Sequence, residues 1–99
     1  MQGLDIFLLN SHLNFINLIK MSNEAILRAI FSESLAISTE EVIDSLEYNT
    51  IPKWDSLGHM SIVAKIEDTF NIMLDTDDIL DMNSFGKAKE ILSKYDIEF

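Results

Sequence analysis

Apolar residues recur at three- and four-residue intervals in the first regularly patterned part of the chain. Between residues 23 and 35, the positions with this spacing are Ile26, Leu27, Ile30, Phe31 and Leu35. Such spacing gives a helix one apolar face, and either Ser22 or Asn23 can cap its first turn. The pattern therefore predicts a helix over residues 23–35 that buries one side.

A second apolar stretch follows a proline. Pro52 lacks a backbone donor and biases the residue before it away from helical conformation, so a helix is expected to begin just beyond it. Asp55 or Ser56 is the expected N-cap, and Asn71 ends the pattern. The apolar positions between them are Ile62, Val63, Ile66 and Phe70. We therefore expect a helix over residues 56–70.

The segment between these helices carries one short helical signal. Ser38-Thr39-Glu40-Glu41 matches a capping box. The apolar residues after it, Val42, Ile43 and Leu46, leave room only for a short turn before a polar stretch. We expect a long connecting loop anchored by these apolar side chains.

Two more helices are predicted in the last third of the chain. A short one around residues 76–81 carries Ile79 and Leu80 inward, and Ser84 can cap the last one. The last helix has an apolar stripe of Phe85, Ala88, Ile91, Leu92 and Tyr95, with Lys87, Lys89 and Lys94 outside it. The fold class is therefore all-α: a four-helix bundle with a short third helix and a long loop between helices one and two.

Residues 1–20 differ from the rest, since they hold one acid, one base and many Leu, Ile, Phe and Asn residues. They lack the basic start of a secretory signal and are too polar for a membrane span. Two interpretations stay open. The segment is an added amphipathic helix with Leu9, Leu13, Ile16 and Ile19 on one face, or it is translated upstream sequence and Met21 is the true start. We assign residues 1–20 as an N-terminal extension and residues 21–99 as one domain.

Charge narrows the range of partners. The 99 residues include 17 acids and 7 bases, which gives a net charge of −10. Such a chain repels nucleic acid and anionic membranes and attracts basic surfaces of other proteins. Because the chain has no cysteine, any thiol chemistry has to come from a cofactor.

Side-chain catalysis and metal binding are poorly supported. Ser56 and Gly58 have the spacing of a nucleophile elbow, but Trp54 replaces its first glycine and a loop precedes it instead of a strand. His59 could face Ser56, yet no orienting acid is evident, and surface or interface packing is the simpler role for His59. Asp75, Asp77, Asp78 and Asp81 are spaced partly like a calcium loop, but Ile79 and Leu80 occupy ligand and glycine positions. We expect those aspartates to form a solvated face.

Ser56 has two interpretations from the residues alone. It can be a simple helix cap, as such residues mostly are. Alternatively, the unpaired N–H groups and the dipole at the start of the helix favour a phosphate esterified to its hydroxyl.

The arrangement as a whole resembles the acyl carrier protein family over residues 23–95. The matching positions are Asp55-Ser56-Leu57, Ile66-Glu67-Asp68-Thr69-Phe70, Ile72, Leu74, Met82, Phe85, Ala88 and Leu92. The resemblance implies an acyl-carrier-like bundle in which Ser56, flanked by Asp55 and Leu57, is esterified by 4′-phosphopantetheine from coenzyme A. It also implies a cytoplasmic monomer that carries acyl or aminoacyl groups as thioesters and is not itself an enzyme.

By the same resemblance, the partners are a phosphopantetheinyl transferase and loading and acyl-transfer enzymes with basic docking patches. The residues implied in docking are Asp55, Leu57, Met60, Glu67, Asp68, Asp75, Asp77 and Asp78. Gly58, Ser61 and Lys65 depart from the acidic pattern of many fatty-acid carriers. They put docking to fatty-acid synthase enzymes in doubt. Trp54 and the Gly58-His59-Met60 continuation look more like stand-alone carriers of specialised pathways, such as polyketide or nonribosomal peptide biosynthesis.

A competing hypothesis keeps the carrier fold and removes the arm. The chain would then be an unmodified acidic helical module that binds a protein partner. The weakened acidic pattern of the second helix and the unusual first 20 residues support it.

Overall fold

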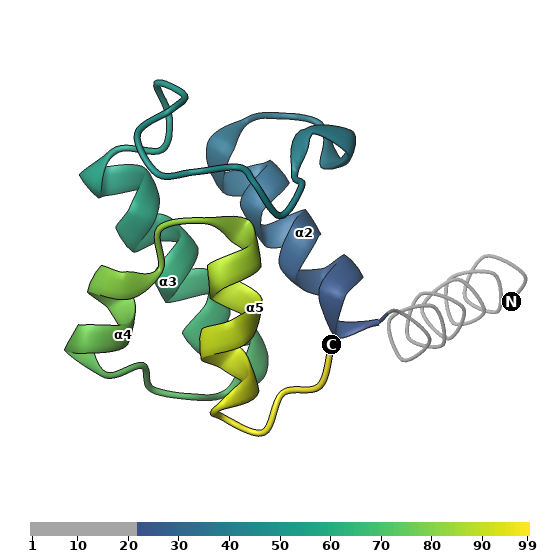
Figure 1. The fold of residues 1–99 in the computed structure, drawn as a ribbon, viewed down its shortest axis with the longest axis vertical. Coiled ribbons are helices and arrows are strands. Elements are labelled where there is room, and N and C mark those ends of the chain that lie inside the picture. Colours follow the sequence, from purple (N-terminus) through teal and green to yellow (C-terminus); the bar gives the residue numbers. More distant parts are fainter. Residues whose placement is uncertain (1–21) are drawn as a thin grey trace, which may run out of the picture.

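The computed structural model describes residues 22–99, which form four α-helices and one short 3₁₀ helix (Figure 1). The elements are α2 (Asn23–Leu35), η1 (Thr39–Glu41), α3 (Ser56–Phe70), α4 (Thr76–Asp81) and α5 (Phe85–Ser93). In this part of the chain the only β pairing is an isolated antiparallel bridge between Glu47 and Ser84. The prediction of a small all-α bundle is confirmed, whereas the extension at residues 1–20 lies outside the described residues.

Polar side chains cap three of the helices where the sequence predicts. The Ser22 hydroxyl accepts a hydrogen bond from the Ala25 N–H at 3.0 Å, and the Ser84 hydroxyl accepts one from Lys87 N–H at 3.0 Å. Asp55 caps α3 in the same way. The capping box at Ser38 is wrong: this side chain makes no capping bond, because the segment completes only a single 3₁₀ turn.

The core includes one large residue from the long loop as well as the helix faces. Phe31 of α2 meets Trp54 and Phe85 edge-on, with ring centroids 5.3 and 5.1 Å apart. All three side chains are fully buried. Because Trp54 immediately precedes Asp55, the start of α3 is attached directly to the core.

The long loop is also attached to the turn between α4 and α5. The Tyr48 N–H donates to the Asn83 carbonyl at 2.8 Å, and the Phe85 N–H donates to the Leu46 carbonyl at 3.0 Å. Val42 is buried, as expected of an anchor. Ile43 is 55% exposed, so the expectation that it anchors the loop is wrong.

Candidate functional site

Ser56 is the first residue of α3, and its side chain is exposed. The preceding Asp55 performs the capping, since its Oδ1 accepts the Gly58 N–H at 2.9 Å. The hydroxyl of Ser56 is therefore not needed as a cap. Its hydrogen-bonding neighbour is the hydroxyl of Tyr48, at a long 3.4 Å.

Gly58 allows the loop to pass close to the first turn of α3. A Cβ at this position would lie 1.9 Å from the backbone oxygen of Lys53, a distance that no side chain tolerates. The glycine is therefore required by packing. The sequence interpretation weighed it as part of a nucleophile elbow and as a departure from other carriers, and missed this role.

An apolar pocket of about 280 Å³ opens beside Ser56. Its rim consists of exposed residues, namely Tyr48, Met60, Leu80 and Asn83. Leu80 is 74% exposed, so the expectation that it points inward is wrong. Its inner wall consists of His59, Ile79 and Met82, of which Met82 is 1% exposed. The pocket thus lies between the long loop, the start of α3 and α4, with the serine at its edge.

His59 is held from both sides by hydrogen bonds. The indole Nε1–H of Trp54 donates to Nδ1 at 3.0 Å, and because an indole can only donate, the imidazole proton lies on Nε2. Nε2 therefore donates to the Ile79 carbonyl of α4 at 2.8 Å. The expectation of surface or interface packing is wrong for His59. With both nitrogens engaged, it is not placed to act as a base toward Ser56.

Most of the residues implied in docking lie at the surface. Leu57 is 82% exposed and Met60 is 52% exposed, both large values for apolar side chains. The carboxylates of Asp68, Asp75 and Asp77 are exposed as well. Glu67 is half-buried, because its Oε2 accepts the Leu74 N–H at 2.9 Å and so stabilises the connection from α3 to α4.

Asp78 departs from this group. It is 8% exposed, so the prediction that it belongs to a solvated face is wrong. Its carboxylate accepts hydrogen bonds from Lys94 Nζ at 2.5 Å and from the Tyr95 hydroxyl at 2.6 Å. These contacts, that of Lys94 first, hold the pKa of Asp78 below its ordinary value. Asp78 therefore joins α4 to the end of α5.

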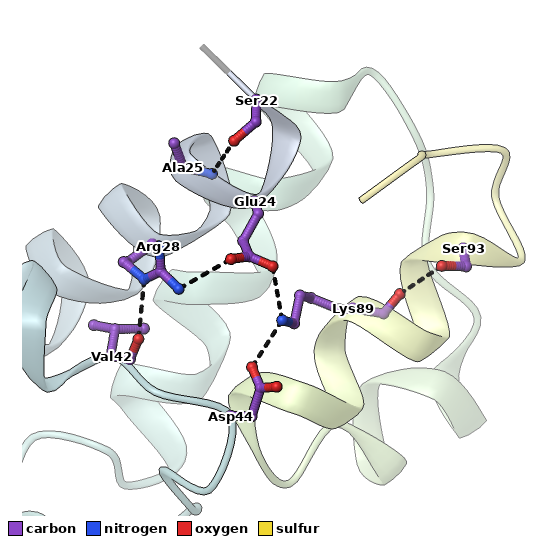
Figure 2. Close-up of polar contacts among 8 residues, drawn as sticks. All are labelled: Ser22, Glu24, Ala25, Arg28, Val42, Asp44, Lys89 and Ser93. Carbon is purple, nitrogen blue, oxygen red and sulfur yellow. Dashed lines mark hydrogen bonds and ion pairs between the residues drawn. The ribbon is translucent and has the colours of Figure 1, made fainter.

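A second set of charges joins α2, the long loop and α5 (Figure 2). Lys89 Nζ lies 2.8 Å from Glu24 Oε1 and 2.7 Å from Asp44 Oδ1. Arg28 donates to Glu24 at 3.1 Å and to the Val42 carbonyl at 3.0 Å. The hydrogen bond from Lys89 is the main cause that lowers the pKa of Glu24, and the bond to Asp44 is the main cause that raises the pKa of Lys89. We call Glu24, Arg28, Asp44 and Lys89 the charged network.

Other kinds of site are not evident between residues 22 and 99. No helix in this range is long and apolar enough to cross a membrane, and none of its acidic and histidine side chains are grouped to hold a metal ion. The chain matches no model of a known protein family and no curated protein.

Proposed function

We propose that this chain is a stand-alone carrier protein in which Ser56 bears a 4′-phosphopantetheine arm derived from coenzyme A. When bound, this group supplies the thiol that holds acyl or aminoacyl cargo as a thioester. The observation that carries the proposal is the exposed hydroxyl of Ser56, which Asp55 leaves free by capping α3 itself. The protein's task is then to present cargo to enzymes, without bond-making by its own side chains.

The surroundings of Ser56 suit a phosphodiester and an attached chain. The first N–H groups of the fifteen-residue helix α3 and its dipole favour an anion at this end. The apolar pocket beside the serine can shelter part of an arm or its cargo from water. The absence of cysteine from the sequence agrees with a reactive sulfur that arrives on the cofactor.

The surface around Ser56 supports docking of basic enzymes. Exposed Leu57 and Met60 can fill apolar recesses on a partner. The exposed acids of α3 and α4, Asp68, Asp75 and Asp77, and the net charge of −10 speed encounter with a transferase or loading enzyme that has a basic surface. Asp78 is left out of this proposal, because its carboxylate is engaged by Lys94 and Tyr95.

Attachment of the arm is the direct test. The purified protein is incubated with coenzyme A and a broad-specificity phosphopantetheinyl transferase, and its intact mass is measured. We expect a gain of one arm in the natural chain and none in Ser56→Ala. Ser61→Ala, which changes another exposed serine of α3, serves as the matched control and should gain one arm. No gain in the natural chain, or an equal gain in Ser56→Ala, would reject the proposal.

The unmodified interaction module is the second candidate. Its support is that Leu57, Met60 and Leu80 are exposed and can contact a partner without an arm on Ser56. If it is correct, Ser56→Ala binds the same partners from the native host as the natural chain does, and the natural chain isolated from that host has the mass of the bare polypeptide.

A further inference from the structure

The inner wall of the pocket beside Ser56 contains a hydrogen-bonded bridge. His59 lies in that wall, and its ring is stacked on Trp54 with centroids 6.2 Å apart and planes 18° apart. One ring nitrogen accepts from the Trp54 indole and the other donates to the Ile79 carbonyl. The bridge therefore runs from the long loop through α3 to α4.

Behind this bridge the bundle is filled. Trp54, Phe31 and Phe85 are fully buried, and the ring of Phe31 meets each of the other two edge-on. Protein interiors of this kind are close-packed and hold few voids larger than a water molecule. A chain that passed His59 would have to displace these aromatic rings.

Displacing His59 is also opposed by its hydrogen bonds. Moving the ring would leave the indole N–H of Trp54, which is fully buried, without its acceptor. It would also remove the donor that the Ile79 carbonyl uses. Unpaired buried polar groups are costly, so the bridge resists opening more than an apolar contact of the same size would.

We propose that His59 is a specificity-determining residue that stops the cargo at the inner end of the pocket and so selects short acyl chains. This inference rests on the proposed carrier function. A volume of about 280 Å³, with about 30 Å³ for each water-sized group, holds about nine such groups at most, because the rim is exposed. The pocket thus shelters an acyl chain up to about the length of octanoyl, and the further atoms of a longer chain remain in water.

The test follows the reactivity of the thioester as the chain grows. Protein carrying acetyl, octanoyl or dodecanoyl cargo is exposed to hydroxylamine, and the half-life of each thioester is measured. We expect octanoyl to survive roughly tenfold longer than acetyl, because its methylenes are buried, and dodecanoyl to lie within about twofold of octanoyl. In His59→Ala the dodecanoyl half-life should exceed that of octanoyl by at least about threefold. Ser61→Ala, outside the pocket, should follow the natural chain.

Each result supports or overturns the length limit. A half-life that keeps rising to dodecanoyl in the natural chain, or that does not change with length, overturns it while leaving the carrier function intact. Failure of the natural chain to accept an arm rejects the carrier function and the length limit with it. If His59→Ala loses its helical circular dichroism, and so does not fold, the three thioester half-lives of the natural chain still test the length limit. The indole N–H resonance of Trp54 should keep one chemical shift with all three cargoes, and its displacement by dodecanoyl overturns the proposal.

Discussion

The charged network and the Ser56 pocket use polar residues in opposite ways. In the charged network, Lys89 is shared by Glu24 and Asp44, and Arg28 adds a further contact to Glu24 (Figure 2). At the pocket, the hydroxyl of Ser56 has, among residues 22–99, only a long contact to Tyr48, and the rim beside it carries the exposed apolar side chains of Met60 and Leu80. The difference teaches that acids in this chain are structural where a base or a backbone N–H faces them, as at Glu24, Asp55 and Glu67, and that other exposed acids remain available to partners.

The exposed rim of the pocket nevertheless rests on a rigid frame. The Lys53 carbonyl packs against Gly58, and the indole of Trp54 donates a hydrogen bond to His59. These contacts lie beneath Ser56 and Leu57 and do not use them. At the pocket, therefore, buried contacts hold the backbone in place while the exposed side chains make few contacts. In the charged network, the charged side chains contact one another. Substitutions in the two regions should therefore change the stability of the protein by different amounts.

The largest effect on stability is expected where the frame of the pocket is tightest. Gly58→Ala places a Cβ against the Lys53 backbone oxygen and should lower the free energy of unfolding by about 3 kcal/mol. Urea denaturation followed by circular dichroism measures the change. Gly86→Ala is the matched control: its Cβ would lie 3.1 Å from the Asp44 oxygen, so we expect a loss below about 1 kcal/mol. Equal losses in the two variants would contradict the close approach at Gly58.

A smaller effect is expected in the charged network. Lys89→Met removes the base shared by Glu24 and Asp44 and should cost about 1–2 kcal/mol in the same denaturation experiment. The control is Lys87→Met on the same helix, whose only ion pair within residues 22–99 is an exposed contact to Glu90 at 3.6 Å. That variant should change stability by less than about 0.5 kcal/mol. If Lys87→Met costs as much, the network has no special role.

The contact between α4 and α5 should depend on pH. The pKa of Asp78 is lowered, chiefly by the hydrogen bond from Lys94, so its contribution to stability is fully present above its ordinary pKa of 3.8. That contribution is lost as the pH falls through the lowered value. We expect Asp78→Asn to unfold at lower urea than the natural chain at neutral pH, and the two midpoints to converge in strong acid. Asp77→Asn, exposed on the same helix, should show no such convergence because it starts with no difference.

The smallest effect on stability belongs to the rim of the pocket. Leu57 is 82% exposed, so Leu57→Ala should alter the free energy of unfolding by no more than about 0.5 kcal/mol. As a docking contact, its loss should lower kcat/KM for arm transfer by about tenfold. The assay measures arm transfer at several protein concentrations. An unchanged kcat/KM would remove Leu57 from the docking surface.

Local signals in the sequence predicted the helices and their caps well. The periodic apolar positions define α2 and α3 with the bounds observed, and Ser22, Asp55 and Ser84 each cap a neighbouring turn. These features depend on residues three or four positions apart, which the sequence displays directly. The exposure of Leu57 and Met60 was also inferred, although from resemblance.

The misses involve contacts between distant parts of the chain. His59 is positioned by Ile79, twenty residues away, and Asp78 is buried by Tyr95, seventeen residues away. A helical pattern shows which side of α4 is polar but not that a lysine and a tyrosine just after α5 will cover one carboxylate. The requirement for glycine at position 58 was missed for the same reason. It arises from a loop carbonyl that lies close to Gly58 only in the folded chain.

The two ends of the described chain meet on one side of the bundle. The Asn23 side chain donates to the Glu98 carbonyl at 2.9 Å, and Figure 1 shows the C-terminus beside the start of α2, whereas α3 begins at the opposite side. A fluorophore, affinity tag or solid support attached next to either end therefore leaves Ser56 facing away from the attachment. The domain is thus suited to immobilisation for measuring enzyme capture at the serine, and a short peptide joining residues 99 and 22 would suit circular permutation while keeping the Ser22 cap.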